Sequence, residues 1–95
     1  MADITVRRTH GMELDEAKSK VRDIVSDLQR DADYIDKVKW NSDGTAADVK
    51  GKGFKGNFRV DDQEVVVDID LKLLAKPFKG KIEEKVASRM DNYFG

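Results

Sequence analysis

One run of glycines and lysines could hold phosphate: it reads Gly51-Lys52-Gly53-Phe54-Lys55-Gly56. Phosphate-binding loops of this composition deliver their backbone amides at the N-terminus of a helix, whereas here a strand-like alternation of apolar and polar residues follows. The run therefore fails as a phosphate loop. It still allows a basic patch for an anionic partner, formed by Lys50, Lys52, Lys55 and Arg59. Alternating charge on the solvent face of a sheet explains the same residues, and we favour that interpretation.

The single histidine, His10, could act as a general acid or base. Catalysis by a histidine usually requires a partner that orients the ring and a nucleophile within reach. No Ser or Cys motif in the sequence offers either. We interpret His10 as a turn residue that bonds local backbone, and we expect a protein that is not an enzyme.

Acidic residues raise the question of a metal site, above all Asp61-Asp62 and the pair Asp68 and Asp70. In a strand, Asp68 and Asp70 share one side, but Lys72 follows on that same side and no calcium-loop spacing is present. We therefore expect no bound metal and no cofactor.

Hydrophobic periodicity predicts the elements that position these residues. Apolar and polar residues alternate over five segments, which predicts strands at 4–9, 34–40, 45–51, 54–60 and 64–73. The last strand carries Leu73 on its apolar side, and Val66 is the one apolar residue on its polar side. A turn is expected at 41–44, and a bulge or tight hairpin near 51–53.

Apolar residues at helical spacing predict helices over 13–30 and 77–94. Pro77 suits the first turn of the second helix, where its missing N–H removes a donor that would have no partner. Phe78 begins the apolar stripe of that helix, which continues through Ile82, Val86, Met90 and Phe94.

These elements predict an α+β fold in one domain, residues 1–95, with the order β-α-β-β-β-β-α. A right-handed crossover through the first helix and a meander bring the fifth strand back beside the first. The sheet of about five strands is thus expected to be mainly antiparallel, in the order 2-3-4-5-1, with both helices on one face. That arrangement leaves room for an apolar cleft between sheet and terminal helix, with four candidate contact residues: Trp40, Phe58, Phe78 and Ile82.

Composition excludes several classes of protein. The 18 basic and 19 acidic residues give a net charge of -1, whereas a general nucleic-acid binder should be strongly basic. The chain has no cysteine, so disulfides cannot hold it together. No apolar run approaches the ~20 residues of a membrane span and no signal-peptide pattern begins the chain. We expect a cytoplasmic protein with no membrane span and no nucleic-acid partner.

Five stretches together resemble the putative polyhydroxyalkanoic acid system protein family. They are 4–17 with Arg7, His10 and Glu16-Ala17; Trp40 before its turn; Gly53-Phe54-Lys55-Gly56-Asn57-Phe58-Arg59-Val60; 71–78; and Ile82-Glu83. The resemblance implies an intracellular bacterial protein associated with polyhydroxyalkanoate metabolism, at the surface of polyester storage granules. It supplies no catalytic residue.

Four functional hypotheses follow. The first is a non-enzymatic accessory protein that presents an apolar surface to the polyester or to granule coat proteins; Val66, Leu74 and the edge of the last helix are the candidate surface. The second is a small binding module that holds a hydroxyacyl or fatty-acyl group in the cleft. An enzyme acting on hydroxyacyl thioesters has little support, because no nucleophile and base are paired. A structural domain with a protein partner is the fourth, and its oligomeric state stays open.

Overall fold

The computed structural model describes residues 2–31 and 35–94. In chain order it contains β1 (Ile4–Thr9), α1 (Leu14–Asp31), β2 (Ile35–Trp40), β3 (Ala46–Gly51), β4 (Phe54–Val60), β5 (Glu64–Leu71), a 3₁₀ helix η1 (Leu73–Phe78) and α2 (Lys79–Phe94). The predicted order of strands and long helices is confirmed. The start of the second predicted strand, Tyr34, lies outside the described residues.

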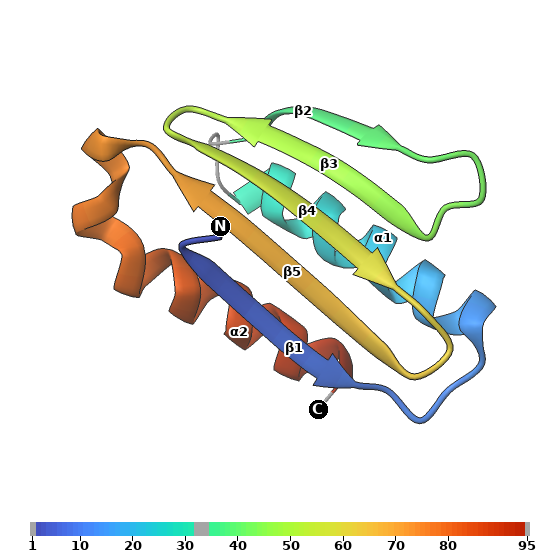
Figure 1. Cartoon of the computed structure of the whole chain (residues 1–95). Coiled ribbons are helices and arrows are strands. Elements are labelled where there is room, and N and C mark those ends of the chain that lie inside the picture. The colour runs from blue at the N-terminus through green and yellow to red at the C-terminus, as the bar shows by residue number, and fades with distance from the viewer. Residues whose placement is uncertain (1, 32–34, 95) are drawn as a thin grey trace.

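One five-stranded sheet forms the frame of the molecule, in the order β1-β5-β4-β3-β2. Every neighbouring pair is antiparallel, with Ile4 opposite Ile69 and Phe58 opposite Val67. Both helices lie on the same face, α1 behind β3 and β4 and α2 behind β1 and β5 (Figure 1). The predicted α+β class, the strand order 2-3-4-5-1 and the one-sided helix layer are confirmed.

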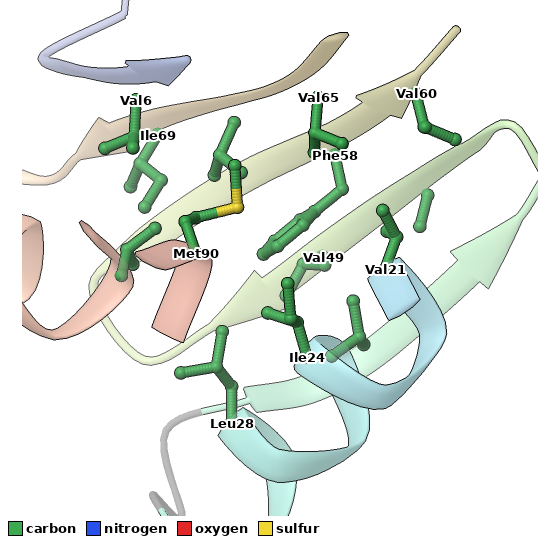
Figure 2. Close-up of a cluster of buried hydrophobic side chains, with 14 of the residues drawn as sticks. Val6, Val21, Ile24, Leu28, Val49, Phe58, Val60, Val65, Ile69 and Met90 are labelled. Atoms are coloured by element: carbon green, nitrogen blue, oxygen red, sulfur yellow. The ribbon is translucent and has the colours of Figure 1, made fainter. Parts of the chain in front are cut away.

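The core lies between this sheet face and the two helices. Alternate residues of each strand point inward because successive side chains of a strand face opposite sides, and the helices contribute residues three and four apart. Figure 2 shows Ile24 and Leu28 of α1, Phe58 of β4 and Met90 of α2 directed into one space. Ala47 and Val49, the inward residues of β3, are buried.

The outer face of the sheet is polar, with one buried exception. Val66 is only 6% exposed, because its cross-strand neighbours are Arg7 on β1 and Arg59 on β4, whose long stems cover it. The expectation that Val66 belongs to an exposed apolar surface is therefore wrong. Beside it, the Asp68 carboxylate accepts hydrogen bonds from the Thr5 hydroxyl at 2.8 Å and from the Arg59 guanidinium at 2.7 Å.

The chain leaves the sheet earlier than its apolar pattern indicates. β5 ends at Leu71, and Leu73 is 80% exposed in η1 instead of facing the core. The amide of Ala75 bonds the carbonyl of Lys72 at 2.9 Å, which turns the backbone into the 3₁₀ helix. Pro77 lies inside η1, and Phe78 is 55% exposed rather than buried in the helix stripe. The predicted places of Leu73 and Phe78 are thus corrected.

Two glycine turns join the strands as expected. Gly44 (φ 75°) closes the turn at 41–44, where the Asn41 side chain accepts a hydrogen bond from the Ala46 amide. Gly53 (φ 90°) closes the β3–β4 hairpin, a backbone conformation that favours glycine. Of the two structures expected near 51–53, a bulge or a tight hairpin, the hairpin is present. A register shift is found between Ile35 and Lys37 in β2.

Candidate functional site

An apolar groove of about 500 Å³ opens between the helix layer and the sheet. Its floor comes from the middle strands, with Gly56 and Phe58 of β4 flanked by Val49 and Ile69. A groove forms here partly because Gly56 has no side chain. A Cβ at that position would lie 3.7 Å from Ile69 Cγ1 and 3.9 Å from Val49 Cβ, which is ordinary contact distance.

The walls of the groove come from the two helices and η1. Leu28 of α1 forms one wall, and Ile82 and Val86 of α2 form the other. Ala75 and Phe78 of η1 complete the lining at the end where η1 meets the β3–β4 turn. The contact there is close, since a Cβ on Gly53 would lie 3.1 Å from Ala75 Cβ.

The charged residues that line the groove are all lysines. Lys52 comes from the β3–β4 turn, and Lys81 and Lys85 come from α2. No acidic side chain of the described residues lines it. Lys52 and Lys81 are exposed and form no salt bridge within residues 2–31 and 35–94. The groove therefore combines an apolar interior with a positively charged border.

The four predicted cleft residues do not all meet. Phe58, Phe78 and Ile82 line the groove, from three different elements. Trp40 does not line it: the groove reaches β2 only at Ile35, and Trp40 is at the other end of that strand. Its half-buried ring lies under the Arg22 guanidinium carbon, 5.6 Å from the ring centroid. Trp40 thus packs against α1 as a cation–π partner.

The four residues of the predicted basic patch are divided between two faces. Lys50 and Lys55 lie directly opposite each other on the outer face, and Lys37 of β2 is the next neighbour in that row. Arg59 lies on the same face but pairs with Asp68. Lys52 lines the groove on the other face. Lys81 and Lys85 of α2 are not among the predicted site residues. Their spacing of four residues nevertheless places both on one side of a helix.

A second candidate surface lies on η1. The exposed large apolar residues of the described chain are Leu73 (80%), Leu74 (88%) and Phe78 (55%), and all three belong to this one short helix. We refer to Leu73, Leu74 and Phe78 as the apolar ridge. In Figure 1 the segment between β5 and α2, drawn in orange, projects beyond the end of the sheet. Three lysines flank or interrupt the ridge: Lys72, Lys76 and Lys79.

Asp3 fixes the position of η1. Its carboxylate accepts a hydrogen bond from the Leu71 amide at 2.7 Å, and its other oxygen lies 3.9 Å from Lys76 Nζ. The N-terminal segment thus ties down both the end of β5 and the 3₁₀ helix. This matters for the apolar ridge, because exposed leucines would otherwise favour a collapsed position against the core.

His10 lies outside both candidate surfaces. It is 2% exposed, and its Nδ1 accepts the Met12 amide at 3.4 Å. Nε2 therefore carries the ring proton and donates to the Asp61 carbonyl at 2.6 Å. The local bond agrees with the turn interpretation, while the second bond joins the end of β1 to the β4–β5 turn. Both ring nitrogens are occupied by backbone groups.

The acidic residues serve turns and strand pairs. Asp61 accepts hydrogen bonds from the amides of Glu64 (2.7 Å) and Gln63 (2.8 Å), which hold the pKa of its carboxyl below the ordinary value. Among residues 2–31 and 35–94, no three His, Cys, Asp or Glu side chains gather in a way that could hold a metal ion. In the same part of the chain, no helix is long and apolar enough to cross a membrane.

The arrangement offers two apolar surfaces that share one segment. Ala75 and Phe78 of η1 face the groove, while Leu73 and Leu74 of the same helix are exposed to solvent. Comparison with curated proteins and with solved structures finds no match. A family model, described as "Putative polyhydroxyalkanoic acid system protein", matches residues 4–94.

Proposed function

The chain belongs to the putative polyhydroxyalkanoic acid system protein family, and from that premise we propose that it is a non-enzymatic accessory protein that attaches to the surface of polyester storage granules. The apolar ridge is the observation that supports this most. Soluble domains scatter exposed apolar residues singly, whereas gathered ones mark a contact surface. Here they fall within six residues, Leu73–Phe78. The proposed location is the cytoplasm, at the granules.

The energetics of such a contact are favourable. Full burial of a leucine or phenylalanine side chain stabilises by roughly 1.5–3 kcal/mol, so even partial burial of the apolar ridge in polyester contributes several times RT. The ridge needs no rearrangement to reach a surface, because η1 already projects past the sheet (Figure 1). Lys72 and Lys79 can keep their ammonium groups in water while their stems lie along the polyester.

Purified protein and polyhydroxybutyrate beads test this proposal. The wild type is expected to sediment with the beads, and the double variant Leu73→Ser/Leu74→Ser is expected to stay in the supernatant with an unchanged melting temperature. The matched control is Asp62→Ser/Gln63→Ser, in the exposed β4–β5 turn at the opposite end of the sheet, and it should bind as the wild type does. A wild type that ignores the beads, or a ridge variant that still binds them, contradicts the proposal.

The absence of catalysis is part of the same proposal. It is supported by His10, whose two ring nitrogens are taken up by the Met12 amide and the Asp61 carbonyl. A general acid or base needs a nitrogen free to face its substrate. Pure protein should leave a 3-hydroxyacyl thioester unchanged, as followed by release of free thiol, and any turnover above the blank would refute this part.

The groove supports a second candidate function, a module that holds a hydroxyacyl or fatty-acyl group. Its volume of about 500 Å³ falls within the ~300–1,000 Å³ range of small-molecule sites. The substitution Gly56→Leu would place a side chain on its floor without removing any core group. If the function is acyl binding, this variant folds but no longer binds an acyl chain. Binding unchanged in Gly56→Leu would place the ligand elsewhere.

A further inference from the structure

Resting on the acyl-binding function just proposed, we infer that the groove is built for an acyl chain with a free carboxylate, the chain lying on the apolar floor and the carboxylate held by Lys52 and Lys81. Two independent features carry this inference. One is the apolar interior, and the other is the sign of every charge along the border.

The interior selects for a hydrocarbon chain. Floor and walls are aliphatic or aromatic, from Phe58 of β4 to Leu28 of α1 and Val86 of α2. The missing side chain at Gly56 leaves the floor open. No described side chain of the lining other than the lysines carries a hydrogen-bonding group, so a polar ligand placed there would lose its water contacts without replacement.

The border selects for an anion. The whole chain has 19 acidic and 18 basic residues, yet the charged lining residues are all lysines. Lys52 and Lys81 come from the β3–β4 turn and from α2, and neither has a salt-bridge partner within residues 2–31 and 35–94. Glu83 and Glu84, the acidic residues that follow Lys81 in α2, do not line the groove. Cations without partners beside an apolar surface favour a negatively charged ligand group.

The lysines also indicate which anion. Bidentate binding of phosphate groups is typical of arginine, and no arginine of the described residues lines the groove. A lysine is a single point charge that suits one small anionic group. A carboxylate at the end of the acyl chain meets this requirement. For the bulky polyphosphate of a nucleotide thioester, the described lining offers only one further cation, Lys85, which already has another interaction.

Titration with octanoate and methyl octanoate tests the inference, because the two probes share a chain and differ in charge. Octanoate is expected to bind more tightly, by about three- to tenfold, and the difference should shrink at high salt. The double variant Lys52→Gln/Lys81→Gln keeps most of each lysine stem. It should weaken the binding of octanoate by a similar factor and leave the binding of the ester unchanged. The control Lys50→Gln/Lys55→Gln, on the outer face, should change neither.

The length of the acyl chain provides the second readout. Each further methylene from hexanoate to decanoate, below the micelle concentration, should tighten binding by about three- to fourfold if the chain enters the groove. Gly56→Leu should abolish that dependence.

The outcomes separate the inference from the function on which it rests. If acid and ester bind equally and Gly56→Leu weakens both, the carboxylate inference is overturned and the acyl groove stands. If neither probe binds the wild type, both are overturned.

Discussion

The backbone amide of Lys72 donates a hydrogen bond to the carbonyl of Gly53 at 2.8 Å. This bond fixes the β3–β4 turn against the start of η1. The turn supplies Lys52 to the groove, and η1 supplies Phe78 to the groove and Leu74 to the solvent. Both candidate surfaces therefore depend on one junction.

Gly53 should be the least replaceable glycine of this junction. Gly53→Ala is expected to destabilise the fold by about 1–2 kcal/mol, because a side chain at φ 90° is strained. The added Cβ would also press on Ala75 at 3.1 Å. Urea denaturation measures the loss. Gly11→Ala is the control, since a Cβ there meets nothing within 4 Å, and equal midpoints for the two variants would contradict the assignment.

Replacement of His10 tests its structural role. His10→Ala leaves the bonds to the Asp61 carbonyl and the Met12 amide unmade, and it opens a cavity beside Phe94, whose ring centroid lies 6.2 Å from that of His10. We expect a loss of about 2–4 kcal/mol in the free energy of unfolding. The exposed neighbour change Thr9→Ala should cost less than about 0.5 kcal/mol. A stable His10→Ala protein would show that the two bonds contribute little.

The Arg8–Asp91 pair predicts how stability depends on pH. Arg8 Nε donates to the Asp91 carboxylate at 2.7 Å and holds the pKa of that carboxyl below its ordinary value. A lowered pKa in the folded state means that the contribution is present above the ordinary Asp pKa and is lost as the pH falls through the lowered value. Wild type should therefore exceed Asp91→Asn in melting temperature at neutral pH and converge with it in acid. A difference that persists unchanged at low pH would exclude this charge pair as the cause.

Truncation of Val66 should lower the stability of the fold much more than truncation of Leu74. Val66→Ala is expected to cost about 1–2 kcal/mol, because its methyl groups are buried between Arg7 and Arg59. Leu74→Ala should change stability by less than about 0.5 kcal/mol, since that side chain is 88% exposed. Thermal melts of the two variants measure the difference. An equal loss of stability in both would be incompatible with the exposed fractions of the two side chains.

The sequence was sufficient for the sheet because period-two alternation is strong where one face is buried. Val65, Val67 and Ile69 could only face the core together. It failed at Leu73, where the alternation continues by chance for one more step. The Lys72 amide still bonds the Gly53 carbonyl in register with the β4–β5 pairing, and the strand ends where the Ala75 amide turns back to the Lys72 carbonyl. The apolar alternation through Leu73 does not show that turn.

The residues of the groove were predictable from the sequence only in part. Phe58, Phe78 and Ile82 are apolar residues on elements that were correctly paired, so their convergence followed from topology. For Trp40 only the residue type favours a place in the groove. The groove reaches β2 at Ile35, and Trp40 is at the opposite end of that strand. The sequence does not single out the border lysines of α2, because charged residues on an amphipathic helix usually only face solvent.

The pairing of β1 with β5 also constrains how the protein forms during synthesis. Ile4 lies opposite Ile69 and Thr9 opposite Glu64, so the first strand made must wait for the last before it has a neighbour. Until Leu71 has left the ribosome, β1 has no strand to pair with and Ile4 and Val6 stay uncovered. Closing so long a loop is slow. Folding of this chain is therefore expected to begin in the β3–β4–β5 meander and to finish, after translation of almost the whole chain, with the addition of β1.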